Sequence, residues 1–286
     1  MSVHFKTATI IGVGLLGGSL GLALKERKLA DRVRGVGRRQ ESLDKAVAVG
    51  AVDEVSLDAR AACEGADLVV VCTPAAMVTS TLDMIQPACG PDCVVTDVAS
   101  TKAEICDHAR RTWPRPCRFV GSHPMAGSEK FGPENACSDL YEASVTFVEI
   151  GDVLDSHTRE SVKALWEAVG SQTVDVRPSV HDSLVARTSH IPHIAAACMA
   201  ILAAREGDVQ AFAGKGFRDA TRIAGGRPEI WRDICLTNGR AIVAGLEDLI
   251  HDLSEVCDLI TDGDASGLDA LFADGNAARQ RVVSEP

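Results

Sequence analysis

The sequence predicts an α/β protein in two parts: a doubly wound, mostly parallel sheet over residues 1–177, then an all-helical region over residues 178–286. Short β-rich runs alternate with helix-spaced apolar stretches as far as Pro178, and this alternation is typical of α/β domains. The strand candidates are almost continuously apolar, as in LVVVC, which a parallel sheet covered on both faces requires. After Pro178 the pattern is helical and contains no convincing strand.

The elements of the first part follow one another in regular order. The expected strands are Ala8–Val13, Val33–Val36, Leu68–Cys72, Val94–Val98, Phe119–Gly121, Val145–Ile150 and Thr173–Val176. The helix-spaced stretches between them are Leu15–Glu26, Gln40–Val49, Ala75–Ile85, Lys102–Arg111 and Thr158–Val169. Successive strand–helix–strand units of this kind cross over in the same hand and build one parallel sheet.

The second part is divided by glycine and proline near Gly214–Gly216, Gly225–Pro228 and Gly263. Its first long helix, Ile194–Ala204, is apolar nearly all round, so we expect it to be buried on most sides. A small helical domain achieves this burial more easily by dimerising, and a homodimer through this region is therefore expected.

The composition limits the class of partner. Apolar residues make up 46% of the chain and charged residues 24%, as in an ordinary globular protein. The net charge of −11 argues against nucleic acid and anionic membranes as partners, and means that an anionic substrate must be captured by local cations. Because no apolar run approaches the ~18 residues of a membrane span and the N-terminus has no signal-peptide pattern, a cytoplasmic location is expected.

Ten cysteines are scattered along the chain without a C-x-x-C motif or a zinc-type pairing with histidine. Most of them stand among apolar residues, where free thiols behave as small hydrophobic side chains. We therefore expect them to be reduced and structural, and we expect no metal site.

A glycine-rich turn follows the first expected strand. Gly12, Gly14 and Gly17 form a G-x-G-x-x-G motif, and the helix that begins near Leu15 and Leu16 comes directly after it. The first glycine allows a tight turn, the second lets the backbone approach a pyrophosphate, and the third permits close packing of helix and strand. This strand–turn–helix context predicts a Rossmann-type dinucleotide site, the alternative being a glycine-rich turn in another α/β protein.

The end of the second strand bears on the choice between NAD and NADP. An acidic residue is typical of this position in NAD-binding domains, but here Gly37 is followed by Arg38 and Arg39. Two arginines without the acid indicate a clamp for the 2′-phosphate, so NADP is favoured over NAD. The alternative is a solvated basic turn.

Polar clusters lie at further strand ends, where ligands of doubly wound folds bind. Thr73 and Pro74 follow one expected strand, Asp97 lies near the end of the next, and all three are expected cofactor contacts. The other clusters are Thr96–Lys102, Gly121–Glu129, Ser189–His193 and Gly216–Arg222.

Together these segments resemble the prephenate/arogenate dehydrogenase (TyrA) family over nearly the whole chain. The motifs that carry the resemblance are GVGLLGGSLGLAL, TDVASTK, GSHPMAGSEKFGPENA, SHIPH, FRDATRIA and PEIWRDI, in the family's order. The resemblance implies a Rossmann domain followed by a helical dimerisation domain. It also implies oxidative decarboxylation of prephenate or arogenate, with hydride transfer to NAD or NADP, in tyrosine biosynthesis.

The resemblance also assigns the catalytic roles. His123 matches the family's catalytic histidine, and a neutral imidazole can accept a hydrogen bond from the substrate hydroxyl. Ser100 matches the active-site serine that orients the histidine and the nicotinamide, although it is also placed to cap the helix that follows. Asp97 and Lys102 are expected at least to frame this turn.

The substrate contacts are expected from the second part of the chain and one loop. Arg222 matches the family's carboxylate-binding arginine, whose planar fork suits bidentate binding. Pro192 is expected to kink its helix and turn Ser189, His190 and His193 towards the domain cleft. Ser128 and Glu129 are expected to contact substrate or gate its entry, while Trp231 is assigned to the core or a dimer interface.

Three alternatives remain open. The sequence does not decide between prephenate, which is favoured, and arogenate. A β-hydroxyacid dehydrogenase would need a lysine on a helix of the second domain, whereas the lysine that follows Pro178, Lys215, is expected in a loop. A non-catalytic dinucleotide sensor would have no need for His123, Ser100 and Arg222 together.

Overall fold

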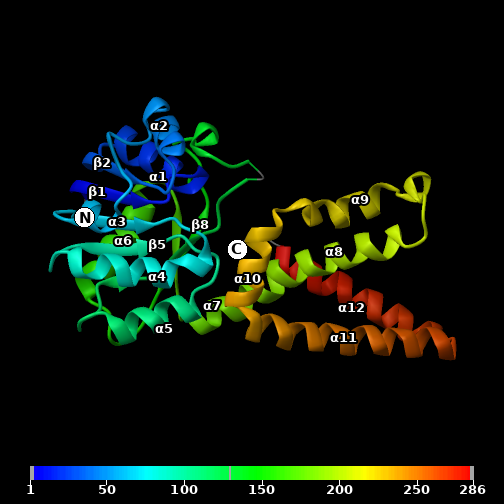
Figure 1. Ribbon diagram of the computed structural model, residues 1–286. Coiled ribbons are helices and arrows are strands. Elements are labelled where there is room, and N and C mark those ends of the chain that lie inside the picture. The colour runs from blue at the N-terminus through cyan, green and yellow to red at the C-terminus, as the bar shows by residue number, and fades with distance from the viewer. Residues whose placement is uncertain (1–2, 129, 284–286) are drawn as a thin grey trace. The chain divides into compact units, whose positions relative to one another are not determined.

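A six-stranded parallel sheet forms the centre of the N-terminal part of the computed structural model, which describes residues 3–128 and 130–283 (Figure 1). Its strands are β1 (Phe5–Ile11), β2 (Ala30–Val36), β3 (Glu54–Ser56), β4 (Leu68–Val71), β5 (Val94–Asp97) and β6 (Phe119–Val120), in the order β3-β2-β1-β4-β5-β6. All neighbouring pairs are parallel. The predicted α/β fold is confirmed, and the order reverses between β1 and β4, where such sheets bind ligands.

Helices cover both faces of this sheet. One face packs on α1 (Leu15–Glu26), α2 (Gln40–Ala48) and α6 (Ser156–Ala168), and its core includes Leu20, Leu43 and Trp166. The other face packs on α3 (Ala59–Cys63), α4 (Ala75–Ile85) and α5 (Ala103–Thr112). Coverage of both faces explains why the strand LVVV of β4 is buried at every position. The strand β3 and the helix α3 were not predicted, because they are too short to show a period in the sequence.

A second, three-stranded sheet lies beside the first. It contains β7 (Ser122–Pro124), β8 (Val145–Glu149) and β9 (Gln172–Val176), with β7 antiparallel and β9 parallel to β8. Gly121 separates the strands β6 and β7, which are otherwise continuous in the sequence. Its N–H donates to Oε2 of the buried Glu149 over 2.9 Å. These strands were expected in the main sheet, and β7 was not predicted, because the strand that begins at Phe119 was expected to end at Gly121.

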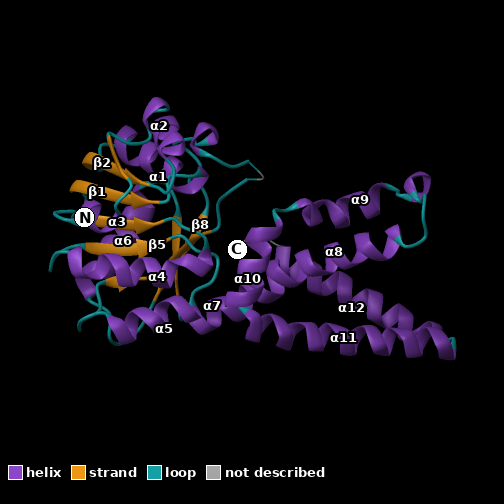
Figure 2. Cartoon of the chain, in the orientation of Figure 1, coloured by secondary structure: helices purple, strands orange, loops and turns teal. Residues whose placement is uncertain are grey.

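The remainder of the described chain is helical, as predicted (Figure 2). The helices are α7 (Pro178–Val185), α8 (Ile191–Ala204), α9 (Lys215–Thr221), α10 (Pro228–Thr237), α11 (Gly239–Asp262) and α12 (Ala265–Val283). Short 3₁₀ turns occur at Gln86–Ala88, Pro133–Asn135, Gln210–Phe212 and Arg222–Gly225. By its contacts the chain divides into two compact units, residues 1–239 and 240–286. The domain boundary expected at residues 177 and 178 stays a prediction.

Two local expectations for the helical region need correction. The helix distortion that was expected at Pro192 lies just before this proline, as a π-helical turn over Ala186–His190. In this turn the Ile191 N–H donates to the Ala186 carbonyl. Lys215 is the first residue of α9 and therefore does not lie in a loop. The preceding Gly214 is the N-cap residue at which this helix begins.

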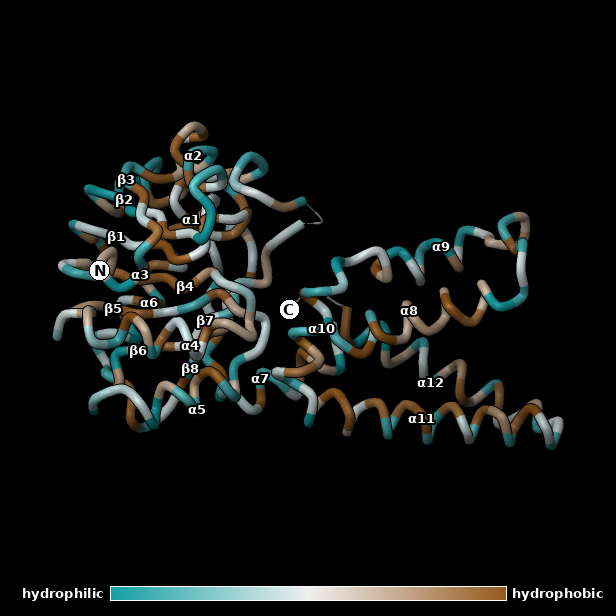
Figure 3. Tube along the Cα trace, viewed as in Figure 1, coloured by the Kyte–Doolittle hydropathy of each residue, from teal (hydrophilic) through white to brown (hydrophobic). Residues whose placement is uncertain are grey.

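Helix α8 is apolar along nearly its whole length (Figure 3). Within the single chain, however, only Ile191 and Ala196 of α8 are buried, whereas Ile201 is 57% and Leu202 60% exposed. The burial on most sides expected from its composition is therefore not supplied by this chain alone. None of the helices in the described part of the chain is both long enough and apolar enough to cross a bilayer.

We predict that Gly21→Ala lowers the free energy of unfolding by about 1–3 kcal/mol. A Cβ on Gly21, inside α1, would lie 2.2 Å from the backbone oxygen of Ala51, so helix and loop would have to separate. Gly216→Ala in α9 is the matched control, because its Cβ would meet nothing within 4 Å and should raise stability by about 0.4–1 kcal/mol. Equal effects of the two substitutions in urea unfolding would contradict this packing argument.

Candidate active site

The glycine turn has the geometry of a dinucleotide-binding loop. Gly12 has a φ of +99°, and a Cβ there would lie 2.6 Å from the Cys72 carbonyl oxygen. A Cβ on Gly17 would lie 2.3 Å from the Gly12 oxygen. Gly14, in contrast, has no atom within 4 Å of where its Cβ would stand, so the backbone there is open to a ligand.

Two further observations fit a bound dinucleotide. Helix α1 begins after Gly14 without a side-chain cap or an acidic residue in its first turn, so the N–H groups of Leu15 and Leu16 are available to an anion. At the end of β4, the buried Thr73 hydroxyl has no hydrogen-bond partner among the described residues. Pro74 follows it as the cap of α4. The residues present therefore fit a dinucleotide between β1 and β4.

The two arginine side chains of the turn after β2 make no internal contacts of their own. Arg38 and Arg39 are exposed, and neither guanidinium group has a hydrogen bond or ion pair within residues 3–128 and 130–283. Gly37 stands where an acidic residue would meet the ribose, and its N–H donates to the Ser56 oxygen over 3.3 Å. Both guanidinium groups are thus available for an anionic ligand.

Asp97 and Lys102 form a buried ion pair at the end of β5, with 0% and 3% of their side chains exposed. Asp97 also accepts from the N–H groups of Ser122 (3.0 Å) and Ala99 (3.1 Å). The two residues therefore frame the turn, as the sequence analysis expected. This burial is not compatible with the direct side-chain contact between Asp97 and cofactor that was also expected.

Ser100 does not cap α5, which corrects the alternative considered for it. The helix begins at Ala103, and the cap is the carboxylate of Asp182 on α7. Its oxygens accept from the N–H of Lys102 (2.7 Å) and of Ala103 (2.8 Å). The half-buried Ser100 hydroxyl is consequently not used as a helix cap.

His123 lies within β7, opposite Phe147 of β8, and is the first member of a hydrogen-bonded chain. Its Nδ1 is 2.9 Å from Nε2 of His181, and Nδ1 of His181 is 2.8 Å from Oδ1 of Asp182. An ionised carboxylate only accepts, so His181 donates from Nδ1 and its Nε2 accepts from Nδ1–H of His123. Nε2 of His123 then carries the lone pair, and no described residue hydrogen-bonds to it.

The surroundings of His123 keep it neutral. Burial lowers its pKa well below the ordinary value for histidine, and the nearby His181, Lys102 and His190 lower it further by charge repulsion. The imidazole is only 9% exposed. A neutral ring with a free Nε2 lone pair can accept a proton or hydrogen bond from a hydroxyl.

His190 lies behind this chain and is not on the surface of the site. It is 2% exposed, and its Nδ1 is 3.2 Å from Nδ2 of Asn238, which also donates to the Asp182 carbonyl over 2.8 Å. Burial lowers the pKa of His190 to about 4. The expected direct contact with substrate is therefore corrected to a supporting position in the same network.

His193 is half-buried and stacks on Trp231, with ring centroids 3.4 Å apart. Its Nδ1 lies 3.1 Å from the carbonyl oxygen of Ser189. A Cβ on Gly226 would come within 2.4 Å of the Trp231 indole nitrogen, so this glycine makes room for the ring. Trp231, expected in the core or a dimer interface, thus supports a candidate substrate-binding histidine.

The exposed Arg222 is close enough to His193 to lower the pKa of that histidine by charge repulsion, in addition to the larger effect of burial. Ser128 is exposed in the loop after β7, where its hydroxyl accepts from the Lys130 N–H over 3.1 Å. Glu129 lies outside the described residues. Arg222 and His193 are thus close enough for their charges to interact. His190 belongs, through Asn238 and the Asp182 carbonyl, to the network that includes His123.

Sequence reasoning missed His181, Asp182 and Asn238. The signal for the first two was a histidine followed by an acidic residue just after Pro178, at the expected start of a helix. Their role depends on a contact between Asp182 and residues about eighty positions earlier, which no local pattern reveals.

Comparison with known proteins gives consistent results for both parts of the chain. Residues 20–175 match the family described as prephenate dehydrogenase, nucleotide-binding domain, and residues 177–274 match prephenate dehydrogenase, dimerization domain. Prephenate dehydrogenase of Bacillus subtilis is 32% identical over 93% of this chain and 73% of its own length.

Two solved structures have the same fold. The structure of prephenate dehydrogenase from A. aeolicus in complex with hydroxyphenyl propionate and NAD+ is 28% identical, with a TM-score of 0.91 over 99% of this chain and 100% of that chain. Synechocystis arogenate dehydrogenase is 30% identical, with a TM-score of 0.85 over 97% of this chain and 100% of that chain.

We predict that stability falls as the pH is lowered through 6. Unfolded histidine has a pKa of about 6.5, whereas burial lowers the pKa of folded His123 and moves that of His190 to about 4. Below pH 6.5 the unfolded chain binds protons that the folded chain does not. The free energy of unfolding should therefore fall by about 1.4 kcal/mol per pH unit for each such histidine.

Urea unfolding at pH 7 and pH 5 measures how steeply the free energy of unfolding depends on pH. His190→Asn should flatten this dependence, and His251→Asn, at a site whose side chain is 74% exposed, is the matched control and should not. A wild-type slope that His190→Asn leaves unchanged would contradict the assignment.

Proposed function

The chain belongs to the prephenate dehydrogenase family, and on that premise we propose that it converts prephenate to 4-hydroxyphenylpyruvate and carbon dioxide with reduction of a nicotinamide dinucleotide. It is an NAD(P)-dependent oxidoreductase of the prephenate/arogenate type. The observation that carries the proposed reaction is the hydrogen-bonded chain Asp182–His181–His123. It leaves one unprotonated imidazole nitrogen free beside the carboxyl edge of a dinucleotide-binding sheet.

The chemistry requires a proton acceptor at the carbinol of a cyclohexadienol. Nε2 of His123 takes the hydroxyl proton as the carbon loses its hydride, and returns it to the phenolate oxygen after carbon dioxide has left. A nicotinamide dinucleotide held at the glycine turn would supply the hydride acceptor. Aromatisation drives the overall reaction, so the protein has mainly to align the substrate and stabilise positive charge developing at the carbinol.

His181 and Asp182 act through His123. They hold its ring in one tautomer, with Nδ1 protonated, and fix its direction, as a carboxylate does for the histidine of a hydrolase triad. Ser100 is assigned the role of orienting the histidine and the nicotinamide. Among the substrate contacts, Arg222 binds a carboxylate, and His193, Ser189 and Ser128 line the approach to it.

NADP is the proposed dinucleotide. The support is the pair of unpartnered arginines, Arg38 and Arg39, together with glycine in place of the acidic residue at position 37. The relative from A. aeolicus was crystallised with NAD+, so the preference needs a direct test. A homodimer through the helical region is proposed as well, in keeping with the exposed apolar surface of α8.

The first test offers prephenate and arogenate, each with NAD+ and NADP+, to the purified protein and follows absorbance of the reduced cofactor. We expect turnover of prephenate with NADP+ to be fastest. Arogenate is the second candidate, because one of the similar structures is an arogenate dehydrogenase. Absence of turnover in all four combinations, from folded protein that binds dinucleotide, would overturn the proposed reaction.

We predict that His123→Gln lowers kcat by about 10²–10⁴-fold, the contribution usual for a positioned general base. The dissociation constant for dinucleotide should not change, because His123 lies on β7 and not on the glycine turn. His108→Gln is the matched control, since that histidine pairs with Asp83 away from the site. A near-normal kcat for His123→Gln would remove His123 from the mechanism.

Arg38→Ala/Arg39→Ala is expected to weaken NADP+ binding at least about tenfold and leave NAD+ binding almost unchanged, because each arginine is assigned charge-assisted hydrogen bonds to the 2′-phosphate. Fluorescence titration of the two dinucleotides measures the change. Arg32→Ala, on the strand β2 that precedes this turn and paired with Glu54, serves as the control. Equal loss for NAD+ and NADP+ would count against a phosphate clamp.

A further inference from the structure

Asn238 is a buried amide that joins the end of α10 to the histidine network. It is the C-cap residue of that helix and is only 5% exposed. Its amide nitrogen, Nδ2, lies 2.8 Å from the carbonyl oxygen of Asp182 and 3.2 Å from Nδ1 of His190. Because a carbonyl oxygen can only accept, the group that faces it must be the NH₂ of the amide and not the amide oxygen. Asn238 therefore has one orientation, in which both amide hydrogens are used.

This orientation determines the protonation of His190. Since Nδ2 of Asn238 is a donor, Nδ1 of His190 must accept, and the ring carries its hydrogen on Nε2. An imidazolium would present an N–H to the amide NH₂, so the contact favours the neutral ring. Burial, the largest effect, lowers the pKa of His190 to about 4. Among the charged groups around it, Asp182 raises this pKa, whereas His181 and His193 lower it.

The two acceptors of Asn238 lie on either side of the π-helical turn between α7 and α8. Asp182 is on α7, before the turn, and His190 is the last residue of the turn. The Asp182 carbonyl also accepts from the N–H of Ala186, with which the turn begins. One side chain at the end of α10 thus contacts both ends of the distorted segment and fixes the separation between them.

The end of α10 is itself attached to the turn after β5. The hydroxyl of Thr237, next to Asn238, donates to the Asp233 carbonyl over 2.8 Å. A hydroxyl has one hydrogen, so the contact of 2.9 Å between the hydroxyls of Thr101 and Thr237 must be donated by Thr101. Thr101 is 1% exposed and directly follows Ser100. The position of Asn238 is therefore set relative to the candidate catalytic residues.

His190 extends the arrangement to the substrate-binding side. Its ring meets the indole of Trp231 edge-on, with centroids 6.2 Å apart and an interplanar angle of 74°. The same indole stacks on His193. Direct contacts thus connect the amide of Asn238 to a candidate substrate-binding histidine as well as to the segment that orients His123.

We propose that Asn238 is a positioning residue for the dehydrogenase reaction, and that its two amide hydrogens hold the catalytic chain and the substrate-binding rings in one arrangement. One hydrogen holds the carbonyl of Asp182, and with it the segment that directs His123. The other holds His190 as the neutral Nε2–H tautomer against which the indole packs. The kinetic consequence rests on the proposed function, whereas the state of His190 does not.

The first test observes His190 in the unmodified full-length protein. Long-range ¹H–¹⁵N NMR spectra of histidine-labelled protein distinguish the two neutral tautomers from each other and from the imidazolium, and His190→Asn assigns the signal. We expect the Nε2–H tautomer at pH 7 and still at pH 5. The Nδ1–H tautomer, or a ring that becomes charged near pH 6.5 like an ordinary histidine, would overturn the proposal.

The second test uses Asn238→Asp, which keeps the shape of the side chain and removes both donated hydrogens. A carboxylate oxygen then faces His190 and should raise the pKa of that ring by about 1–3, because an adjacent negative charge favours the imidazolium. The Asp182 carbonyl loses its donor, so kcat/KM for prephenate should fall at least about tenfold, as for loss of a buried hydrogen bond. The dissociation constant for dinucleotide should not change, because Asn238 is not on the glycine turn.

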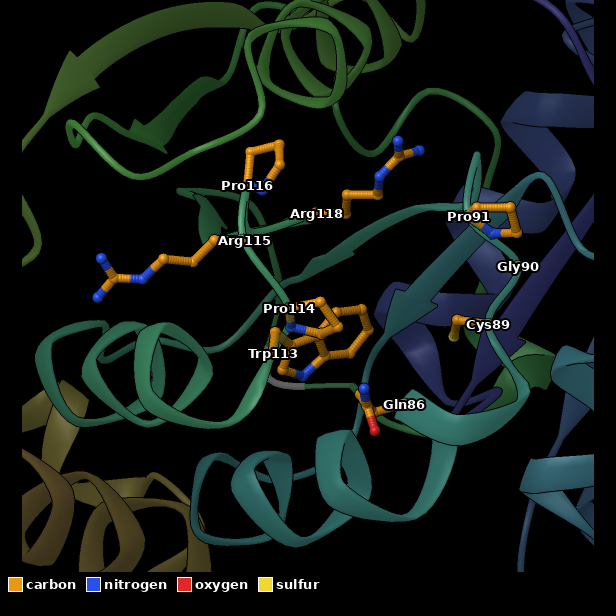
Figure 4. A pocket seen from close by; sticks show the side chains of 9 residues that line it. All are labelled: Gln86, Cys89, Gly90, Pro91, Trp113, Pro114, Arg115, Pro116 and Arg118. Atoms are coloured by element: carbon orange, nitrogen blue, oxygen red, sulfur yellow. The ribbon is translucent and has the colours of Figure 1, made fainter.

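Gln86→Glu is the matched control, because it exchanges an amide for a carboxylate away from the site. Gln86 is half-buried in the 3₁₀ turn after α4 and lines a separate hollow of about 250 Å³ beside Trp113 (Figure 4). This variant should retain the wild-type kcat/KM and the wild-type pKa of His190. Thermal unfolding establishes that both variants are folded.

A purely structural role for Asn238 gives a different result. Asn238→Asp would then lower the melting temperature while the pKa of His190 and kcat/KM stay at their wild-type values, and the proposal would fail. Failure of the proposed function is recognised separately, as absence of turnover in the wild-type protein, and does not alter the NMR result for His190.

Discussion

The carboxylate of Asp182 is the contact on which the candidate active site depends. Through its two oxygens it caps α5, and through one of them it also orients His181. It therefore fixes the turn after β5, the position of α7 and the direction of His123 by one set of hydrogen bonds. Hydrogen bonds to a buried carboxylate are stronger than those between neutral groups, so this junction holds three segments in a single arrangement.

Burial of this network sets the kind of chemistry that it can support. With the pKa of His123 lowered by its surroundings, the ring is a weak base, and it is neutral throughout the physiological range. A general base usually works best when its pKa lies near the operating pH. A weaker one suffices where the reaction is driven by the formation of an aromatic ring, and until it takes the hydroxyl proton the neutral imidazole places no positive charge beside the carbinol.

Several features of the fold and site were predictable because their causes are local. The glycine turn is an example, since the backbone at Gly12 and Gly17 leaves no space for a side chain. His123 was recognised from the motif around it. His181 was not, because its partner lies 58 residues away in the chain, and a sequence pattern carries no record of such a contact.

The misplacement of His190 has a similar origin. A histidine in a helix next to other polar residues appears available to a ligand, and only the packing of Asn238 against it shows that it is enclosed. The second sheet was overlooked because the hydrogen bond that turns the chain at Gly121 is made by Glu149, on another strand. Sequence patterns therefore revealed the elements, while the contacts between them required the structure.

The π-helical turn between α7 and α8 has a consequence for helical phase. His181 and His190 are nine residues apart, which in an uninterrupted α-helix, at about 100° per residue, would put them on opposite faces. The wider turn over Ala186–His190 accommodates roughly one additional residue, so His190 comes round to within about a quarter turn of His181. One inserted residue thus brings two distant histidines to the same side of the helix, and its deletion would rotate α8 and its His193 away while leaving both helices intact.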